Sequence, residues 1–424
     1  MQTSNFRNKN QNKSLLSSPT RKILLVAVSL AVLIACYVLL IASRTPRTVL
    51  TPTVTFTDKI SRPTTNAITW PTDAQAAIGT KDYGILASHE TGHKAPTASV
   101  IKLVTALSIL DKHPLKTDES GPTITISQRD VDIYNNYVAR NGSALPVSVG
   151  QKLTERQALE ALLIKSANNI ADTLVTWAYG SHDKYRVFTA YYLKKLGLNN
   201  TEIGNDASGL DPKSISTASD MVKLGIIAMD NPIIADIVGK SSTDIPGIGM
   251  IHSTNNLLGS NGIIGIKTGT DYHSRGSYLF ASEYKFSDTK NMTIIGSVLS
   301  APSITSAKEQ ALAMLSSAKD NFIEIEPVKS TETVGYYKVP WSNRTVEAIA
   351  LNGIKKVVWR DSLLKTVVSL NDLQSTTKGG KKIGEINLLD KSNQNSYGKT
   401  SVILKDNIPA PSLWWKLTHP FEVW

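Results

Sequence analysis

The sequence predicts a mixed α/β domain followed by a small all-β domain, both carried on an N-terminal transmembrane helix. Three observations predict this architecture. Residues 23–43 are uninterruptedly apolar, residues 67–321 alternate helix-like and strand-like segments, and after Phe322 only short strand-like runs remain. A chain of 424 residues with 41% hydrophobic content is long enough for two or three domains, each with its own core.

The apolar run "ILLVAVSLAVLIACYVLLIAS", residues 23–43, matches the hydrocarbon thickness of a bilayer as a helix. Five basic residues precede it and two follow, which predicts a cytoplasmic N-terminus and an extracytoplasmic body. A cleaved signal peptide and a lipoprotein signal ending at Cys36 are the alternatives. Seven further apolar residues follow Cys36, which favours the anchor. Cys36 is the only cysteine, so the body has no disulfide, thiolate metal site or cysteine nucleophile.

The net charge of +11 does not indicate a nucleic-acid partner. No acidic residue occurs before Asp58, and subtracting the seven basic residues that flank the apolar run from +11 leaves +4 for the rest of the chain. We therefore expect no nucleic-acid binding. The flanking residues are Arg7, Lys9, Lys13, Arg21, Lys22, Arg44 and Arg47.

The remaining organisation follows from composition. Residues 44–66 hold eight threonines and three prolines without helical period, which predicts an extended linker. The aromatic tail "PSLWWKLTHPFEVW" has two interpretations, a membrane-interface segment or rings packed on the β domain. The predicted division is a cytoplasmic tail (1–22), an anchor (23–43), a linker (44–66), a mixed α/β domain (67–321), a β domain (322–408) and an aromatic tail (409–424). The β domain contains the strand-like runs "VEAIAL", "LLKTVVSL", "KIGEINLL" and "TSVILK".

Ser99 and Lys102 lie three residues apart at the start of the amphipathic stretch "TASVIKLVTALSIL", so they share one face of a predicted helix that opens at Ser99. A lysine on a semi-buried face has a lowered pKa, and its neutral form can accept the proton of a serine hydroxyl. The S-x-x-K spacing alone is common. It recurs in polar or turn-rich segments at Ser181, Ser282, Ser287, Ser316, Ser362, Ser375 and Ser396.

Two further clusters follow. Thr154 and Gln157 form a predicted capping box, and "SANN" then separates two apolar helices, so Ser166 and Asn168 are expected on a connection that faces a cleft or caps the helices. In "GIIGIKTGTDYHSRGSYLFAS" two antiparallel strands are predicted, with Lys267 and Thr268 on the inner one. These side chains suit a carboxylate-terminated peptide, although an exposed lysine before a hairpin turn gives the same pattern.

S-x-x-K, S-x-N and K-T-G in this order resemble the signature of penicillin-binding enzymes and serine β-lactamases. The chain most resembles the low-molecular-mass penicillin-binding proteins that act as D-alanyl-D-alanine carboxypeptidases, the S11 serine peptidases. The run "PTASVIKLVTAL", the segment "NDASGLDPKSISTASDMVKL" and the run "NNLLGSNGIIGIKTG" are similar to phrases of that family. The resemblance covers residues 67–408 and implies a catalytic domain with an antiparallel sheet and a helical subdomain.

The resemblance also implies roles. Ser99 is the nucleophile that forms an acyl-enzyme with a peptidoglycan stem peptide, and Lys102 is its base. Ser166 and Lys267 relay the proton to the leaving D-alanine, while Asn168 binds the peptide chain. The terminal carboxylate is held by Lys267 and Thr268, and the oxyanion by the N–H groups of Ser99 and Thr270. No cofactor or metal is implied, and β-lactams are expected to be covalent inhibitors.

Two positions depart from the family pattern. Asn169 stands where an aspartate usually follows S-x-N, and Arg275 replaces an alanine in the longer turn after K-T-G. Both border the site, so they bear on substrate preference and deacylation.

Several alternatives stay open. A D,D-endopeptidase shares all three motifs, and a non-catalytic wall-binding protein can retain the fold. A class A β-lactamase is disfavoured because no "E-x-x-L-N" stretch separates S-x-N from K-T-G. A zinc hydrolase is disfavoured because His252, His273 and the other histidines show no metal-ligand spacing.

Overall fold

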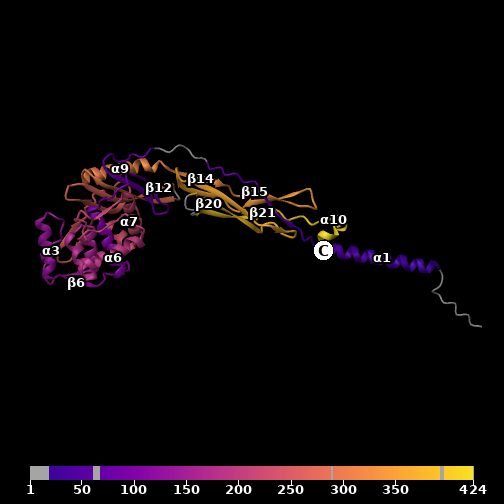
Figure 1. The fold of residues 1–424 in the computed structure, drawn as a ribbon, viewed down its shortest axis with the longest axis horizontal. Coiled ribbons are helices and arrows are strands. Elements are labelled where there is room, and N and C mark those ends of the chain that lie inside the picture. Colours follow the sequence, from indigo (N-terminus) through magenta and orange to yellow (C-terminus); the bar gives the residue numbers. More distant parts are fainter. Residues whose placement is uncertain (1–18, 61–66, 288–289, 392–395, 424) are drawn as a thin grey trace, which may run out of the picture. The chain divides into compact units, whose positions relative to one another are not determined.

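The computed structural model describes residues 19–60, 67–287, 290–391 and 396–423, and its contacts divide the chain into two compact units. One unit comprises residues 63–323 and 359–361, and the other combines residues 324–358 and 362–424 with the N-terminal segment (Figure 1). The basic tail before residue 19 and the linker residues 61–66 lie outside the described residues.

The first unit is built on a five-stranded antiparallel sheet with the strand order β11-β12-β13-β3-β4. Successive residues of a strand face opposite sides of a sheet. On β13, Ile295 meets Gly225 of helix α7 on one face, whereas Gly296 lies against Met314 of helix α9 on the other. The sheet is therefore covered on both faces. The bounds are β3 Gln75–Thr80, β4 Gly84–His89, β11 Ile263–Thr270, β12 Gly276–Ser287, β13 Lys290–Ala301, α7 Ala218–Asp230 and α9 Ile304–Lys319.

A helical subdomain extends from this sheet. Its central helix α2 (Lys102–Lys112) has buried residues at every position from 102 to 110, so it is surrounded by other helices instead of facing solvent. The capping box of Thr154 and Gln157 that the sequence predicts is present at the start of α4 (Glu155–Leu163). The remaining elements are β5 Ala95–Pro96, η1 Ala98–Ile101, β6 Thr123–Thr125, α3 Gln128–Ala139, β7 Lys152–Thr154, α5 Asn168–Tyr179, α6 His182–Lys195, β8 Ile215–Ser216, α8 Pro232–Val238, β9 Ser242–Ile245 and β10 Gly249–His252.

The second unit is all-β in its globular part, as the sequence predicts. Its main sheet has the order β18-β20-β21-β16-β15-β2, and the runs quoted above correspond to four of these strands. The bounds are β14 Phe322–Val328, β15 Thr333–Lys338, β16 Thr345–Ala350, β17 Ile354–Trp359, β18 Leu364–Leu370, β19 Leu373–Gln374, β20 Lys382–Asp390 and β21 Ser396–Leu404.

The N-terminal segment belongs to this second unit. Helix α1 (Pro19–Ser43) contains the predicted span and is long and apolar enough to cross a membrane. The linker prediction is wrong for residues 49–54, because β1 (Val49–Leu50) pairs with β19 and β2 (Pro52–Val54) pairs with β15. Val49, Thr51, Thr53 and Val54 are β-branched residues, which favour a strand once a sheet edge is available.

The aromatic tail packs against the β domain in part. Helix α10 (Leu413–Thr418) places Trp415 against Trp341 at a ring-centroid distance of 5.5 Å, while Trp414 is 75% exposed. Lys416 Nζ donates to the carbonyls of Ala42 (2.7 Å) and Arg44 (2.6 Å), at the end of α1. The short helix α11 (Pro420–Val423) follows and exposes Phe421. Trp415 therefore packs on the β domain, as one interpretation expects, whereas Trp414 and Phe421 are exposed, as the membrane-interface interpretation expects.

Candidate active site

Ser99 lies on a single 3₁₀ turn, η1, that directly precedes α2. The prediction of an α-helix opening at Ser99 is wrong by one turn. Ala98 has a positive φ of 46°, and the N–H of Lys102 bonds to the carbonyl of Ser99, an i to i−3 bond. Ser99 is half-buried, so its hydroxyl remains accessible while Lys102 behind it is 0% exposed.

The Lys102 ammonium donates three hydrogen bonds. Its Nζ lies 2.7 Å from Ser99 Oγ, 2.7 Å from Asn168 Oδ1 and 2.8 Å from the Ser208 carbonyl. Burial lowers the pKa of Lys102 from 10.5 to about 7, although the carboxylates of Asp206 and Asp172 oppose this shift. Near neutral pH, a large fraction of Lys102 is therefore the free amine, which can accept a proton from the Ser99 hydroxyl.

Ser166 and Lys267 form a second bonded pair. Ser166 lies in the connection after α4 with a φ of 62°, and this left-handed backbone interrupts the helical path before α5. Lys267 Nζ donates to Ser166 Oγ at 2.9 Å and to the Thr268 carbonyl at 3.0 Å. Burial and the nearby Lys102 lower the pKa of Lys267 well below 10.5. Among the described residues, Ser166 therefore hydrogen-bonds to Lys267, whereas Ser99 hydrogen-bonds to Lys102.

Asn168 is the first residue of α5, and the expected connection contains only Ser166 of the predicted pair. Its Oδ1 accepts from Lys102, and its own N–H donates to the Ser143 carbonyl at 2.8 Å. The side chain therefore has its amide nitrogen available for a peptide carbonyl.

Lys267, Thr268 and Gly269 lie on β11, which is the edge strand of the sheet. The interpretation that the lysine lies on an inner strand is therefore wrong. An edge strand leaves its outer backbone groups unpaired, so an extended peptide can add to it. A Cβ on Gly269 would lie 2.9 Å from the Ser99 nitrogen, so the absence of a side chain lets β11 approach η1 closely. Thr270 follows and is exposed.

The structure thus brings the three motifs to one place. The S-x-x-K and S-x-N motifs meet at Lys102 and Asn168, the S-x-N and K-T-G motifs meet at Ser166 and Lys267, and β11 meets η1 at Gly269.

Two contributors were not predicted. The Ser208 carbonyl accepts from Lys102, and Thr254 Oγ1 lies 2.7 Å from Thr268 Oγ1. Ser208 acts through its backbone, which carries no residue-type signal. Thr254 directly precedes the run "NNLLGSNGIIGIKTG", and its hydroxyl is the one signal in the sequence that points to it.

The departure at Asn169 has a structural explanation. The side chain is 0% exposed, accepts from the Leu145 N–H at 2.9 Å and donates to the Leu145 carbonyl at 2.9 Å. An aspartate can only accept, so it cannot make both bonds. Asn169 therefore holds the loop before β7 and adds no charge to the site.

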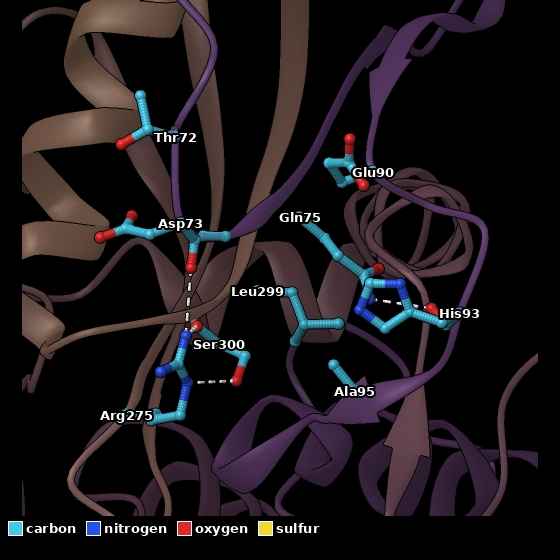
Figure 2. A pocket seen from close by; sticks show the side chains of 10 residues that line it. Thr72, Asp73, Gln75, Glu90, His93, Ala95, Arg275, Leu299 and Ser300 are labelled. Carbon is cyan, nitrogen blue, oxygen red and sulfur yellow. Dashed lines mark hydrogen bonds between the residues drawn. The ribbon is translucent and has the colours of Figure 1, made fainter.

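Arg275 closes the turn after β11 and lines a cavity of about 350 Å³ (Figure 2). Its guanidinium donates to Ser300 Oγ at 2.8 Å, to the Ser300 carbonyl and to the Asp73 carbonyl at 3.1 Å. The arginine thus ties the starts of β12 and β3 to the end of β13. The cavity is lined by Thr72, Asp73, Ala74, Gln75, Glu90, His93, Ala95, Arg275, Leu299 and Ser300.

Comparisons with known proteins agree with this geometry. Residues 62–303, more than half of the chain, match the family model Peptidase_S11, D-alanyl-D-alanine carboxypeptidase. The chain is 26% identical over 324 residues to D-alanyl-D-alanine carboxypeptidase DacD of Salmonella typhimurium, which covers 72% of this chain and 79% of that protein. It is 29% identical over 142 residues to a D-alanyl-D-alanine endopeptidase of Escherichia coli, covering 34% of this chain and 42% of that protein.

Solved structures show the same fold. Penicillin binding protein 5 from Haemophilus influenzae superposes with a TM-score of 0.57 at 17% identity, over 82% of this chain and 99% of that one. PBP3 from Streptococcus pneumoniae gives a TM-score of 0.58 at 19% identity, over 81% and 100% of the two chains. The fold, the family match and the converging motifs lead to one conclusion: this chain belongs to the S11 family of serine peptidases, the low-molecular-mass penicillin-binding D-alanyl-D-alanine carboxypeptidases.

Proposed function

We propose that this protein removes the terminal D-alanine from peptidoglycan stem pentapeptides through an acyl-enzyme on Ser99. The observation that carries the proposal is the buried Lys102 amine, 2.7 Å from Ser99 Oγ, with a pKa lowered to about 7. A lysine with this pKa is about half in its neutral form near physiological pH, so it can accept a proton. Once protonated, it can donate that proton again later in the reaction.

Acylation begins when the Ser99 Oγ attacks the carbonyl carbon of the penultimate D-alanine while its proton moves to Lys102 Nζ. The negative charge that forms on the substrate oxygen is bound by the N–H groups of Ser99 and Thr270. Such donors each contribute about 3 kcal/mol of transition-state stabilisation. The close approach of β11 to η1 at Gly269 supports this role, because it brings the two N–H-bearing segments together.

The C–N bond then breaks, and the leaving D-alanine nitrogen takes the proton that Lys102 received from Ser99, passed on through Ser166 and Lys267, which returns Lys102 to its neutral form. Their 2.9 Å hydrogen bond supports a relay between them. In this proposal Asn168 binds the peptide chain, while Lys267 and Thr268 hold the terminal carboxylate. Water hydrolyses the Ser99 ester and releases the shortened stem.

A D,D-endopeptidase that cuts cross-links is the second candidate, and the endopeptidase relative favours keeping it. The same Ser99 chemistry serves both reactions, and water hydrolyses the ester in both. Only the leaving group differs, because the carboxypeptidase releases a free D-alanine and the endopeptidase releases the second stem peptide of a cross-link. A non-catalytic wall-binding protein would share the fold without acylation.

We further propose that residues 23–43 cross the cell membrane once, with residues 1–22 in the cytoplasm and the peptidase domain (67–321) outside. Helix α1 and the flanking charges support this topology. The β domain (322–408) and the tail (409–424) then lie on the same side as the wall substrate. β-Lactams acylate Ser99 as covalent inhibitors.

The test uses the full chain in detergent, incubated with benzylpenicillin and analysed by intact mass and peptide mapping. We expect a long-lived adduct on Ser99 that is absent from Ser99→Ala and retained in Ser108→Ala, a control on helix α2, which follows η1. Release of D-alanine from a pentapeptide supports the carboxypeptidase, and cleavage of a cross-linked dimer alone supports the endopeptidase. Folded protein that neither forms an adduct nor turns over penicillin would overturn the proposal.

A further inference from the structure

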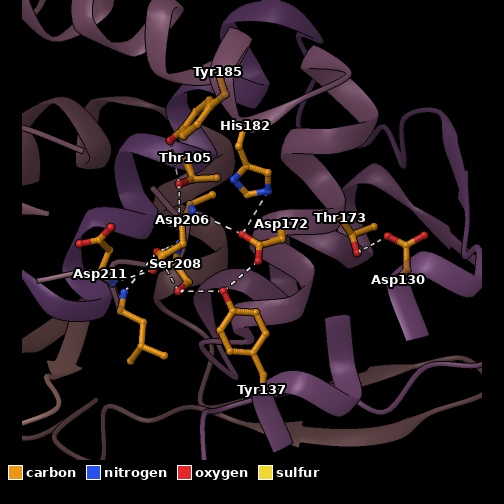
Figure 3. A network of polar contacts seen from close by, with 12 residues as sticks. Thr105, Asp130, Tyr137, Asp172, Thr173, His182, Tyr185, Asp206, Ser208 and Asp211 are labelled. Atoms are coloured by element: carbon orange, nitrogen blue, oxygen red, sulfur yellow. Dashed lines mark hydrogen bonds and ion pairs between the residues drawn. The ribbon is translucent and has the colours of Figure 1, made fainter. Parts of the chain in front are cut away.

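A polar network joins Asp172, Tyr137, Ser208 and Asp206 (Figure 3). The Ser208 carbonyl, which accepts from Lys102, belongs to a loop that Asp206 organises. The Ser208 hydroxyl lies 3.5 Å from the Tyr137 hydroxyl, which donates to Asp172 Oδ2 at 2.8 Å. The network therefore connects the proposed base to a buried carboxylate on α5.

Asp172 is one helical turn after Asn168, so both side chains share a face of α5. It is 8% exposed, and its Oδ1 lies 3.6 Å from His182 Nε2 and accepts from the Ala207 N–H at 3.4 Å. Burial raises the pKa of Asp172, and His182 is the first of the groups that oppose this shift. His182 lies at the start of α6 with a side chain that is 25% exposed, so it joins the carboxylate to solvent.

The charged groups around Asp172 divide into two kinds. Asp206 accepts five hydrogen bonds from the loop at residues 208–211, so its carboxylate is held by that loop and stabilises the loop conformation. Asp130 on α3 accepts from the neighbouring Thr173 instead. The other titratable groups that face this network are Tyr137 from α3, His182 and Tyr185 from α6, Lys102 from α2 and Lys267 from β11.

Lys102 and Lys267 are two buried amines in one site, and Lys102 gains a positive charge when it takes the proton of Ser99. The carboxylates that favour this charged form are Asp206 and Asp172. The Asp206 carboxylate is held by backbone N–H donors. Of the two carboxylates, Asp172 is therefore the one whose charge depends on His182, a partly exposed neighbour.

We propose that Asp172 and His182 are positioning residues for acylation: ionised Asp172 stabilises protonated Lys102, and His182 keeps Asp172 ionised. The inference rests on the proposed role of Lys102 as the base for Ser99. Asp172 itself takes no proton in the step, because the proton passes from Ser99 Oγ to Lys102 Nζ.

The test measures the second-order rate constant of acylation by benzylpenicillin between pH 5 and 9, with the full chain in detergent. We expect Asp172→Asn to move the acidic limb of the profile to lower pH by about one unit and to lower the plateau roughly threefold to tenfold. His182→Gln moves the limb in the same direction by less, and the double variant behaves like Asp172→Asn alone. Asp172→Glu restores the wild-type limb.

Asp183→Asn is the matched control, because it removes an exposed carboxylate next to His182 and should leave the profile unchanged. An unshifted limb in folded Asp172→Asn would overturn the inference, as would a further shift from His182→Gln in that background. If Asp172→Asn does not fold, the pH of the acidic limb is measured for His182→Gln and Asp172→Glu instead. The inference then requires a shift to lower pH in His182→Gln and none in Asp172→Glu. Wild-type protein that forms no adduct on Ser99 contradicts the proposed function instead, so the two failures are distinguishable.

Discussion

At the scale of single residues, the chemistry of this protein depends on how burial changes lysine. Lys102 and Lys267 are both almost fully buried, and burial lowers the pKa of each. The sequence predicts this effect for Lys102 from its place on an apolar face. The sequence does not predict that the carboxylates of Asp206 and Asp172 oppose this lowering of the Lys102 pKa. Asp206 belongs to a loop far along the chain and Asp172 to helix α5, and only the fold brings them near Lys102.

Replacing Lys102 by Gln should remove the base while preserving much of the side-chain volume. We expect acylation by benzylpenicillin to fall by about 10²- to 10⁴-fold at pH 8. In the wild type the rate should rise with pH through about 7, because the neutral amine is the active form. Stopped-flow or quench kinetics measure both, with Lys112→Gln on the same helix as control. A wild-type rate independent of pH between 6 and 8 argues against Lys102 as the base.

Glu155 allows a stability prediction away from the site. It is 0% exposed, neither carboxylate oxygen has a hydrogen-bond partner among the described residues, and burial raises its pKa from 4.5 to about 7. Between these two pH values the folded state keeps a proton that the unfolded state loses. Stability is therefore present below pH 4.5 and is lost as pH rises toward 7, by on the order of 2 to 3 kcal/mol.

Glu155→Gln should remove this loss, so the variant gains stability relative to the wild type as pH rises from 4.5 to above 7. Urea unfolding of both proteins at several pH values measures the difference. Glu309→Gln, which changes an exposed glutamate, should show no such trend. A constant difference between Glu155→Gln and wild type across this range would count against a buried, neutral carboxyl.

At the scale of elements, the sequence predicts the helix, the connection and the strand that carry the three motifs, because each has a distinct period and clear flanking signals. Two local details follow from tertiary contacts that no period contains. The 3₁₀ turn at Ser99 depends on the positive φ of Ala98, and the edge position of β11 depends on which strand pairs with β13.

Gly269→Ala tests the approach of β11 to η1. The new Cβ would lie 2.9 Å from the Ser99 nitrogen and 3.0 Å from the Ala98 Cβ, so one of the two segments must shift. We expect a stability loss of about 1 to 3 kcal/mol and a larger relative loss of acylation, because the displaced N–H groups bind the oxyanion in the proposed mechanism. Gly92→Ala, where the added Cβ meets nothing within 4 Å, is the control. Equal acylation by both variants would contradict the assignment.

At the scale of the whole molecule, composition predicts an anchor, a mixed domain and a β domain, and the family match supports the mixed domain as a peptidase. Composition does not predict that the threonine-rich segment contributes β1 and β2 to the C-terminal sheet. A strand at residues 52–54 is too short to show a period, and its partner β15 lies almost 300 residues further along the chain.

Amide hydrogen exchange tests this pairing. The N–H groups of Thr55 and Phe56 donate to the Val334 carbonyl at 3.0 and 3.2 Å, so both should exchange far more slowly than amides of a free linker. We expect peptides that cover residues 49–56 to be protected in the full chain, and Thr55→Pro, which removes one donor, to reduce that protection. Exchange of this segment within seconds in the wild type would contradict the paired strands.

In the proposed membrane topology, the pairing of β1 and β2 with strands from the far end of the chain also bears on release of the peptidase from the membrane. A protease that cuts once at residues 57–60 breaks the covalent route from the membrane helix to the peptidase. The strands before the cut still hold the β domain, and the peptidase remains covalently joined to that domain through residue 323. Shedding of an active fragment therefore requires two cleavages, one on each side of the peptidase, or a cleavage combined with unzipping of the sheet edge.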